Sequence, residues 1–81
     1  MKVMKFYADW CGPCKALSNT LEGVETDVVI ESVDIDHDST VAMKYGVRGV
    51  PTMIMVEDDG TEIKRKTGAM SKAEIQLFLE V

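Results

Sequence analysis

The amino-acid sequence predicts an α/β fold, and three observations support this assignment. First, an apolar strand at residues 1–7 is followed by a segment of helical periodicity at 12–22 and a β-branched run at 28–35. Second, a continuously apolar run at 53–56 precedes an Asp-Gly turn, which is typical of a hairpin. Third, a capping box opens a final helix at residue 71. Because a helix joins the first two strands, we expect them to lie parallel with a right-handed crossover.

The length and the charge of the chain limit its organisation and its partners. Its 81 residues predict one domain, residues 1–81, with one hydrophobic core. The 9 Lys and Arg against 14 Asp and Glu give a net charge of −5, which disfavours binding to nucleic acids or anionic membranes. Lys2, Lys5 and Asp9 interrupt the N-terminal apolar residues, so no signal-peptide core forms. No apolar run reaches the roughly 18 residues of a membrane span, and we therefore expect a cytoplasmic protein.

Both cysteines of the chain lie where the first strand should lead into the first helix. Pro13 suits the first turn of a helix, where its missing N–H group is not needed. Cys11 then lies at the helix N-terminus and Cys14 one turn further on the same face. Side chains at this spacing are about 5 to 6 Å apart, close enough for a disulfide to close. The pair can therefore alternate between a dithiol and a disulfide.

The position of Cys11 also favours reactivity. Free N–H groups and the positive end of the helix dipole favour a thiolate, which is the nucleophilic form of cysteine. A chain with only two closely spaced cysteines and no export signal favours a redox pair over a structural disulfide. The sequence therefore predicts thiol–disulfide exchange.

The apolar residues of the first helix indicate which side packs on the sheet. Ala16, Leu17, Leu21 and Val24 recur at helical spacing, and we expect this stripe to face the sheet. Gly23 is expected to loosen the end of the helix.

Acidic residues at 34, 36 and 38 resemble the start of a calcium loop. The glycine and glutamate that such a loop needs at its sixth and twelfth positions are replaced by Ser39 and Tyr45. A zinc site is also disfavoured, because two cysteines and one histidine do not complete four ligands. We instead expect Asp38 or Ser39 to cap a short helix that runs through Tyr45 and ends at Gly46. The sequence thus predicts no metal site.

The second half of the chain predicts two strands and a helix. The run 53–56 should be a central strand buried on both faces, with Pro51 placed before its start. After the turn, 62–67 should pair antiparallel and form a charged edge strand, which favours a monomer. In the last helix, Ser71 and Glu74 form the capping box, and the expected hydrophobic staple and inward face comprise Met70, Ile75, Phe78 and Leu79.

Three ordered motifs resemble the thioredoxin family across nearly the whole chain. They are Trp10-Cys11-Gly12-Pro13-Cys14-Lys15, the segment KYGVRGVPT at 44–52 and the segment GAMSK at 68–72. The resemblance implies a minimal thioredoxin fold, with a central four-stranded mixed sheet and three helices, lacking the usual N-terminal strand and helix. It also implies a cis peptide bond before Pro51 that brings Val50 beside Cys11.

The resemblance further implies a reaction and its partners. Cys11 would attack a disulfide in a substrate protein, and Cys14 would resolve the mixed disulfide. No cofactor would be bound, because Cys11 and Cys14 would carry the electrons as a dithiol and form a redox-active disulfide on passing them to the substrate. The electrons would come indirectly from NADPH through thioredoxin reductase. Gly12 and Pro13, between the cysteines, would support the active site.

A shallow apolar surface for substrate is the other implication of the resemblance. An extended segment of a disulfide-containing protein would lie against main-chain groups there. The residues implied are Trp10, Val50, Pro51, Gly68 and Ala69.

Lys5 departs from the family, which usually has a buried aspartate at this position that is thought to move protons for the resolving cysteine. A neutral Lys5 could take over proton transfer, whereas a charged Lys5 could stabilise a thiolate. A third alternative is a side chain that extends along its stem to water and has no role in the site.

Two alternative functions stay open from the sequence. A glutathione-fed carrier similar to glutaredoxin is suggested by the short chain, although Gly-Pro between the cysteines argues against it. A non-catalytic binding module with the same fold is the alternative of another class. Serine replacements at Cys11 and Cys14 distinguish a reductase from a module.

Overall fold

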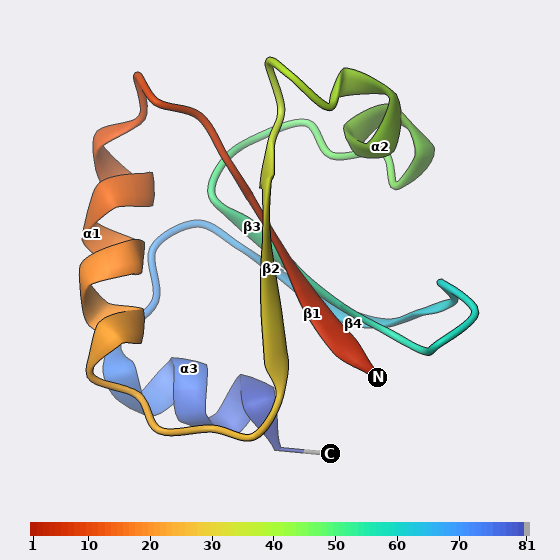
Figure 1. The fold of residues 1–81 in the computed structure, drawn as a ribbon. Coiled ribbons are helices and arrows are strands. Elements are labelled where there is room, and N and C mark those ends of the chain that lie inside the picture. The colour runs from red at the N-terminus through yellow and green to blue at the C-terminus, as the bar shows by residue number, and fades with distance from the viewer. Residues whose placement is uncertain (81) are drawn as a thin grey trace.

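The computed structural model describes residues 1–80. It confirms the predicted α/β class, with four strands and three helices (Figure 1). Each predicted element is present, and its bounds differ from the prediction by two residues at most. In chain order the elements are β1 (Lys2–Tyr7), α1 (Gly12–Glu22), β2 (Val29–Asp34), α2 (Ser39–Lys44), β3 (Thr52–Val56), β4 (Glu62–Thr67) and α3 (Lys72–Leu79).

The four strands form one mixed sheet in the order β2-β1-β3-β4. Strands β1 and β2 are parallel, as the βαβ unit requires, and β1 pairs antiparallel with β3. Strand β4 pairs antiparallel with β3 and lies at an edge, which confirms the hairpin and the edge position. Strand β3 is buried along its whole length, as its apolar run predicts.

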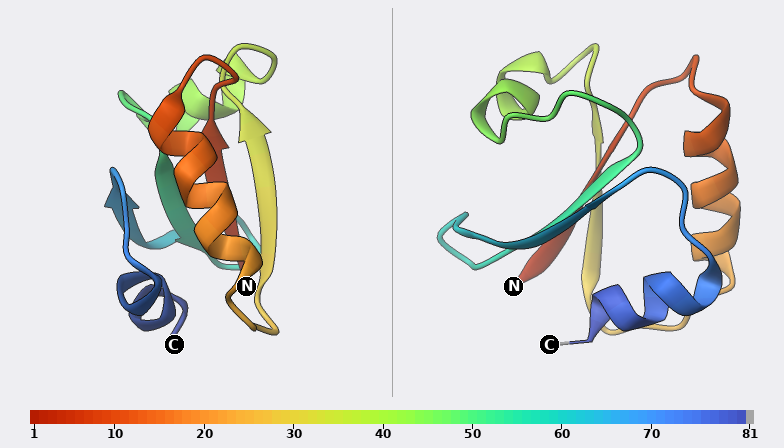
Figure 2. Two further views of the ribbon diagram at one scale, coloured as in Figure 1. Left: turned by 90° about the vertical axis from the view of Figure 1, so that its left-hand side faces the viewer. Right: turned by 180° about the vertical axis from the view of Figure 1, so that it is seen from behind.

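The helices divide between the two faces of the sheet. Helices α1 and α3 cover one face and α2 covers the other (Figure 2). Successive residues of β1 point to opposite faces, so this strand contributes to both cores. The core under α1 and α3 contains Val3, Leu17, Met53, Met55, Met70, Ile75, Phe78 and Leu79. The core under α2 contains Met4, Phe6, Val33, Ala42, Ile54 and Val56.

The side of α1 that faces the sheet differs from the prediction at one residue. Leu17 is buried and Leu21 is half-buried, but Ala16 is exposed, so the predicted inward position of Ala16 is wrong. With 3.6 residues per turn, a residue next to Leu17 points about 100° away from it. The inward stripe instead begins at Cys14, three residues before Leu17.

The ends of α2 and α3 follow recognisable capping signals. Ser71 and Glu74 form the predicted capping box at the start of α3. At α2, Asp38 is the N-cap residue but its side chain caps no N–H group, so the expected side-chain cap is absent there. Gly46 adopts a φ of 64° and ends α2 as predicted. The Val47 N–H donates to the Ala42 carbonyl at 2.9 Å, which completes a Schellman motif.

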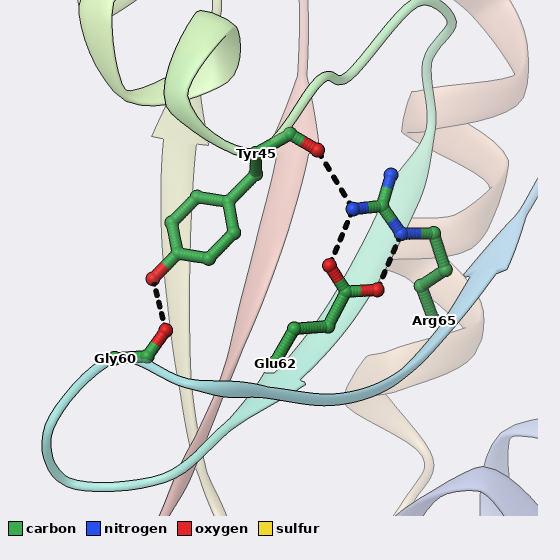
Figure 3. A network of polar contacts seen from close by, with 4 residues as sticks. All are labelled: Tyr45, Gly60, Glu62 and Arg65. Atoms are coloured by element: carbon green, nitrogen blue, oxygen red, sulfur yellow. Dashed lines mark hydrogen bonds and ion pairs between the residues drawn. The ribbon is translucent and has the colours of Figure 1, made fainter.

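A polar network joins the end of α2 to the β3–β4 hairpin (Figure 3). The Arg65 guanidinium donates to both Glu62 carboxylate oxygens and to the Tyr45 main-chain carbonyl, the last at 2.7 Å. The Tyr45 hydroxyl donates to the Gly60 carbonyl, also at 2.7 Å. The hydrogen bond from Arg65 lowers the pKa of the Glu62 carboxyl. Arg65 of β4 therefore holds the C-terminal end of α2 against the hairpin.

Along residues 1–80, no helix combines the length and the apolar character needed to cross a membrane.

Candidate active site

Cys11 is the N-cap residue of α1, as predicted from Pro13 in the first turn. Its Sγ atom accepts a hydrogen bond from the Cys14 main-chain N–H at 3.3 Å. Cys11 and Cys14 are both free thiols and both buried, with 6% and 3% of their surface exposed. A main-chain N–H group that points at Sγ would also stabilise a thiolate at Cys11.

The segment before β3 lies against Cys11. The peptide bond between Val50 and Pro51 is cis, as the resemblance implied. The Cys11 thiol donates to the Val50 carbonyl, with 3.7 Å between the sulfur and oxygen atoms. The Gly68 N–H donates to the Pro51 carbonyl at 2.8 Å, and Gly68 has a φ of 94° that favours glycine. Residues distant in the sequence thus meet beside one thiol.

Trp10 lies on the surface next to Cys11, with 70% of its area exposed. Its indole N–H donates to an Asp36 carboxylate oxygen at 3.1 Å. Asp36 was not among the site residues predicted from the sequence. A signal was present, because Asp36 follows β2 and Trp10 follows β1, and the carboxyl ends of parallel strands meet at the same edge of a sheet.

Cys14 lies deeper than Cys11 and has a perturbed pKa. Burial, and secondly a hydrogen bond with Cys11, raise the pKa of the Cys14 thiol to about 11. A hydrogen bond with the Ala8 main chain and the charge of Lys5 act in the opposite direction. Cys14 is therefore a thiol at neutral pH and must lose a proton before it can act as a nucleophile.

Lys5 lies on the α1 side of the central strand β1 and is only 9% exposed. Its ammonium group donates to the Ser18 hydroxyl, with 2.7 Å between Nζ and Oγ. Burial lowers the pKa of Lys5, and the nearby Cys14 opposes this effect. The alternative of a side chain that extends to water is therefore wrong, because strands on both sides and α1 above enclose it.

Ser18 is the second residue that the sequence analysis missed. It lies four residues after Cys14, so the two side chains share one face of α1. Alternation along β1 places Lys5 on the side of the sheet that α1 covers. The helical spacing of Cys14 and Ser18 and the alternation along β1 together indicate that the side chains of Ser18 and Lys5 meet.

A cavity of about 230 Å³ opens beside Cys14, between the end of β1 and α1. Its wall includes Tyr7, Asp9, Cys14, Ser18 and Asn19. The cavity connects the buried Cys14 and Ser18 to the surface. Residues 1–80 contain no group of three or more His, Cys, Asp or Glu side chains that could hold a metal ion.

Comparison with known sequences gives a consistent result along the chain. The family model "Thioredoxin" matches residues 1–81. Thioredoxin from Pseudomonas aeruginosa is 35% identical over 82 residues, which span 96% of this chain and 75% of the relative. Thioredoxin from Chlamydia caviae is 41% identical over 73 residues, which span 86% of this chain and 71% of the relative.

Solved structures agree with the sequence matches. A single-residue mutant of the thioredoxin from Halobacterium salinarum superimposes with a TM-score of 0.87 at 35% identity, over 96% of this chain and 70% of that one. The thioredoxin of Fasciola hepatica gives a TM-score of 0.83 at 31% identity, over 95% of this chain and 75% of that one.

The fold, the paired cysteines at a helix N-terminus and the relatives lead to one assignment. Thioredoxins act on protein disulfides without a bound cofactor, and their partners are a reductase and disulfide-containing proteins. This chain belongs to the thioredoxin family and is a thiol–disulfide oxidoreductase.

Proposed function

We propose that the protein reduces disulfides of other proteins, with Cys11 as the nucleophile and Cys14 as the resolving thiol. The supporting observation is the position of Cys11 at the N-cap of α1, where its sulfur already accepts the Cys14 N–H. A thiolate formed there gains a charge-assisted hydrogen bond and the field of the helix. Cys14 is more buried and keeps its proton at neutral pH, which suits a group that acts second.

The exchange proceeds in two balanced steps. The Cys11 thiolate attacks one sulfur of the substrate disulfide and expels the other as a thiolate, so a mixed disulfide forms. Cys14 then loses its proton and attacks Cys11 Sγ, which breaks the bond to the substrate. The products are a substrate dithiol and a Cys11–Cys14 disulfide, which holds the oxidation equivalent taken from the substrate.

The substrate segment is proposed to lie on the surface around Cys11. Trp10 supplies an exposed apolar ring, and the Val50 carbonyl next to Cys11 supplies a main-chain acceptor. The Pro51 side chain is fully buried, and its carbonyl accepts the N–H of Gly68, which places the turn Gly68-Ala69 next to the Val50-Pro51 segment. An extended segment could pair with main-chain groups there, as in strand addition to a sheet edge.

Gly12 and Pro13 are proposed to support the site rather than to react. A side-chain Cβ at Gly12 would meet no atom within 4 Å, so this position leaves open space above the cysteines. Pro13 presets the backbone of the first turn and so keeps Cys11 at the helix terminus.

We propose NADPH-dependent thioredoxin reductase as the electron source and the cytoplasm as the compartment, because dithiols are kept reduced there. A monomer is proposed from the basic residues on edge strand β4, since charge discourages pairing between edges. A glutathione-fed cycle is the alternative for the electron source.

The test measures NADPH consumption with a model disulfide protein as acceptor. One reaction contains thioredoxin reductase and the other contains glutathione with glutathione reductase. We expect faster turnover with thioredoxin reductase, whereas a preference for glutathione would replace the proposed electron source.

Serine variants test the roles of the two cysteines in the same assay. Cys11→Ser should abolish turnover, because no other residue in the chain supplies a thiol at the helix N-terminus. Cys14→Ser should stop after the first step and accumulate a mixed disulfide that mass spectrometry detects. Turnover that persists in Cys11→Ser would refute the assignment. A non-catalytic module would give no turnover in this assay even as wild type, and it would keep its biological activity in both serine variants.

A further inference from the structure

A groove lies between edge strand β4 and helix α3, and none of the proposed site residues lines it. The groove has a volume of about 390 Å³, and we call it the β4–α3 groove. Its lining residues are Lys64, Lys66, Met70, Glu74, Leu77 and Phe78. Met70 and Phe78 are buried, whereas Leu77 is 64% exposed. The groove therefore presents an apolar surface to solvent between two lysines and a glutamate.

Strand β4 adds main-chain groups to this surface. It pairs with β3 along one side, and within residues 1–80 no strand pairs with its other side (Figure 2). Every residue of β4 except Lys64 is exposed. An edge strand of this kind presents unpaired N–H and C=O groups, which are a template for an additional strand. The β4–α3 groove thus lies directly below a free sheet edge.

The two lysines of the groove point to the α3 side of β4. Lys64 donates to the Glu80 carbonyl at 2.7 Å, and its ammonium group lies 5.2 Å from the centre of the Phe78 ring. Lys66 lies 3.5 Å from the Glu74 carboxylate, and about half of each of these side chains is exposed. A surface ion pair contributes little to stability. Both ammonium groups can therefore accept a further carboxylate at small cost.

The charge of β4 indicates which strand fits its edge. The whole chain has a net charge of −5, but β4 carries Lys64, Arg65 and Lys66 against the single acid Glu62. Two β4 edges from two copies of the chain would bring these cations together, and like charges on paired strands are destabilising. An acidic strand would instead be attracted. The same lysines therefore discriminate against a second copy and in favour of an acidic partner.

We propose that the β4–α3 groove binds an extended acidic segment of another protein, which adds to β4 as a further strand. Every second side chain of a strand points to the same face. An apolar side chain with acidic residues two positions before and after it would therefore lie against Leu77 and Phe78, with its carboxylates beside Lys64 and Lys66. Main-chain pairing would supply affinity, and the groove would supply specificity. This docking surface is separate from the cysteine site and goes beyond disulfide reduction.

A capped heptapeptide is the probe for this surface. It has phenylalanine at its centre, glutamate two positions to either side and threonine elsewhere, so that the ring and both carboxylates share one face. The peptide is titrated into the ¹⁵N-labelled wild-type protein, and the amide chemical shifts are followed by two-dimensional NMR. We expect saturable shifts in β4 and α3, whereas the amides of β2, the other edge strand, should not move.

A second peptide with lysine in place of both glutamates tests the role of charge, and we expect it to leave the spectrum unchanged. Equal shifts with the two peptides would overturn the proposal, as would an acidic peptide that shifts no amide at millimolar concentration or shifts β2 equally. The free protein provides a further check. Shifts in β4 that change with protein concentration in the absence of peptide would identify a second copy as the occupant and would also overturn it.

A charge reversal in the groove tests the contact directly. Lys66 is exposed, so Lys66→Glu should fold, and we expect it to weaken binding of the acidic peptide by about tenfold. The same variant should gain binding of the lysine peptide. Lys44→Glu on α2 is the matched control, because it changes the net charge equally on the other face of the sheet. Equal weakening in both variants would show that net charge is responsible and not the groove.

Leu77→Ser tests the apolar wall of the groove. Its side chain is exposed, so the fold should persist, and we expect the affinity for the acidic peptide to fall by about three- to tenfold. An unchanged affinity would contradict the assigned position of the phenylalanine ring. Both Lys66→Glu and Leu77→Ser should reduce the model disulfide protein at the wild-type rate. Loss of peptide binding with normal turnover in the wild type would refute this inference alone, and normal binding without turnover would refute only the proposed function.

Discussion

The two faces of the sheet are built from the same strands and differ in what they bury. On the α2 face, the core is built from apolar side chains, from Met4 and Phe6 on β1 to Ile54 on β3, and its buried polar side chain, Thr52, is uncharged and donates to the Gly49 carbonyl. On the α1 face, the site end of the core instead contains Lys5 and Cys14. Since alternate residues of β1 supply both faces, one strand combines a purely apolar pattern with a polar one.

This difference teaches where the fold can accommodate chemistry. The α2 face gains stability from apolar burial and from the network around Arg65. The site end of the α1 face buries two titratable groups, and burial lowers the pKa of Lys5 and raises that of Cys14. Mutations on the α2 face should therefore change stability alone, whereas mutations at the site end of the α1 face should change the pH dependence of stability and the reactivity of the site.

The largest expected effect is on the α2 face. Phe6→Ala should lower the free energy of unfolding by about 3 to 5 kcal/mol, because it leaves a cavity in a fully buried core. Urea denaturation followed by circular dichroism measures the change. Val29→Ala is the control, since Val29 is 65% exposed and should lose less than about 1 kcal/mol. Equal losses of unfolding free energy in Phe6→Ala and Val29→Ala would show that the buried core on the α2 face contributes no more to stability than an exposed position on edge strand β2.

On the α1 face, Cys14 should make stability depend on alkaline pH. Its pKa is raised from 9.0 to about 11 in the folded protein, so its contribution to stability is complete below pH 9. Between pH 9 and pH 11 the folded state binds more protons than the unfolded state, and stability falls.

The free energy of unfolding of wild type minus that of Cys14→Ala, both measured under reducing conditions, should therefore decline by up to roughly 2 to 3 kcal/mol across this pH range. Parallel pH profiles of unfolding free energy for the two proteins would contradict the raised pKa.

Lys5 should affect the pH dependence of stability in the opposite direction, so that stability rises with pH. The pKa of Lys5 is lowered from 10.5 in the folded state, so burying its charge costs most at pH values below its folded pKa. Lys5→Met should raise the free energy of unfolding by about 1 to 2 kcal/mol at neutral pH, as for other buried charges replaced by apolar groups.

The stability advantage of Lys5→Met over wild type should shrink as pH rises to 10.5, because Lys5 then loses its charge and the cost of burying that charge disappears. Denaturation at a series of pH values measures it. A variant less stable than wild type at neutral pH would show that Lys5 contributes to the core as strongly as an apolar residue.

The smallest effect is expected in the network of Figure 3. Tyr45→Phe removes one hydrogen bond, to the Gly60 carbonyl, and should lower the free energy of unfolding by about 1 kcal/mol. The rate of disulfide reduction should not change, because the network lies on the α2 side. A loss of rate without a loss of stability would indicate that the two faces are coupled.

Local signals in the sequence were sufficient for most of the fold. The capping box at Ser71, the apolar run of β3 and the glycine that ends α2 each act within a few residues. Such signals predict elements well because their physical cause is local. The inward side of α1 was predicted less well, since the predicted stripe included Ala16, which is adjacent to Leu17 and points about 100° away from it.

The active site required contacts between distant segments. The cysteine pair at a helix N-terminus follows from the motif alone, and the position of Val50 beside Cys11 was implied by family resemblance. The bond between Lys5 and Ser18 needed the register of β1 against α1, which no short motif encodes. Burial of Lys5 likewise depends on strands β2 and β3, which flank it on both sides.

Trp10 is the sole tryptophan of the chain, and it stands exposed beside Cys11. The intrinsic fluorescence of the protein therefore comes mainly from the redox centre and not from the core. Because the indole is 70% exposed before unfolding, its emission maximum should shift little when the chain unfolds. A bound substrate or a disulfide at Cys11, by contrast, changes the immediate surroundings of the ring. The molecule thus has a built-in optical probe of its oxidation state, while folding must be followed through the backbone.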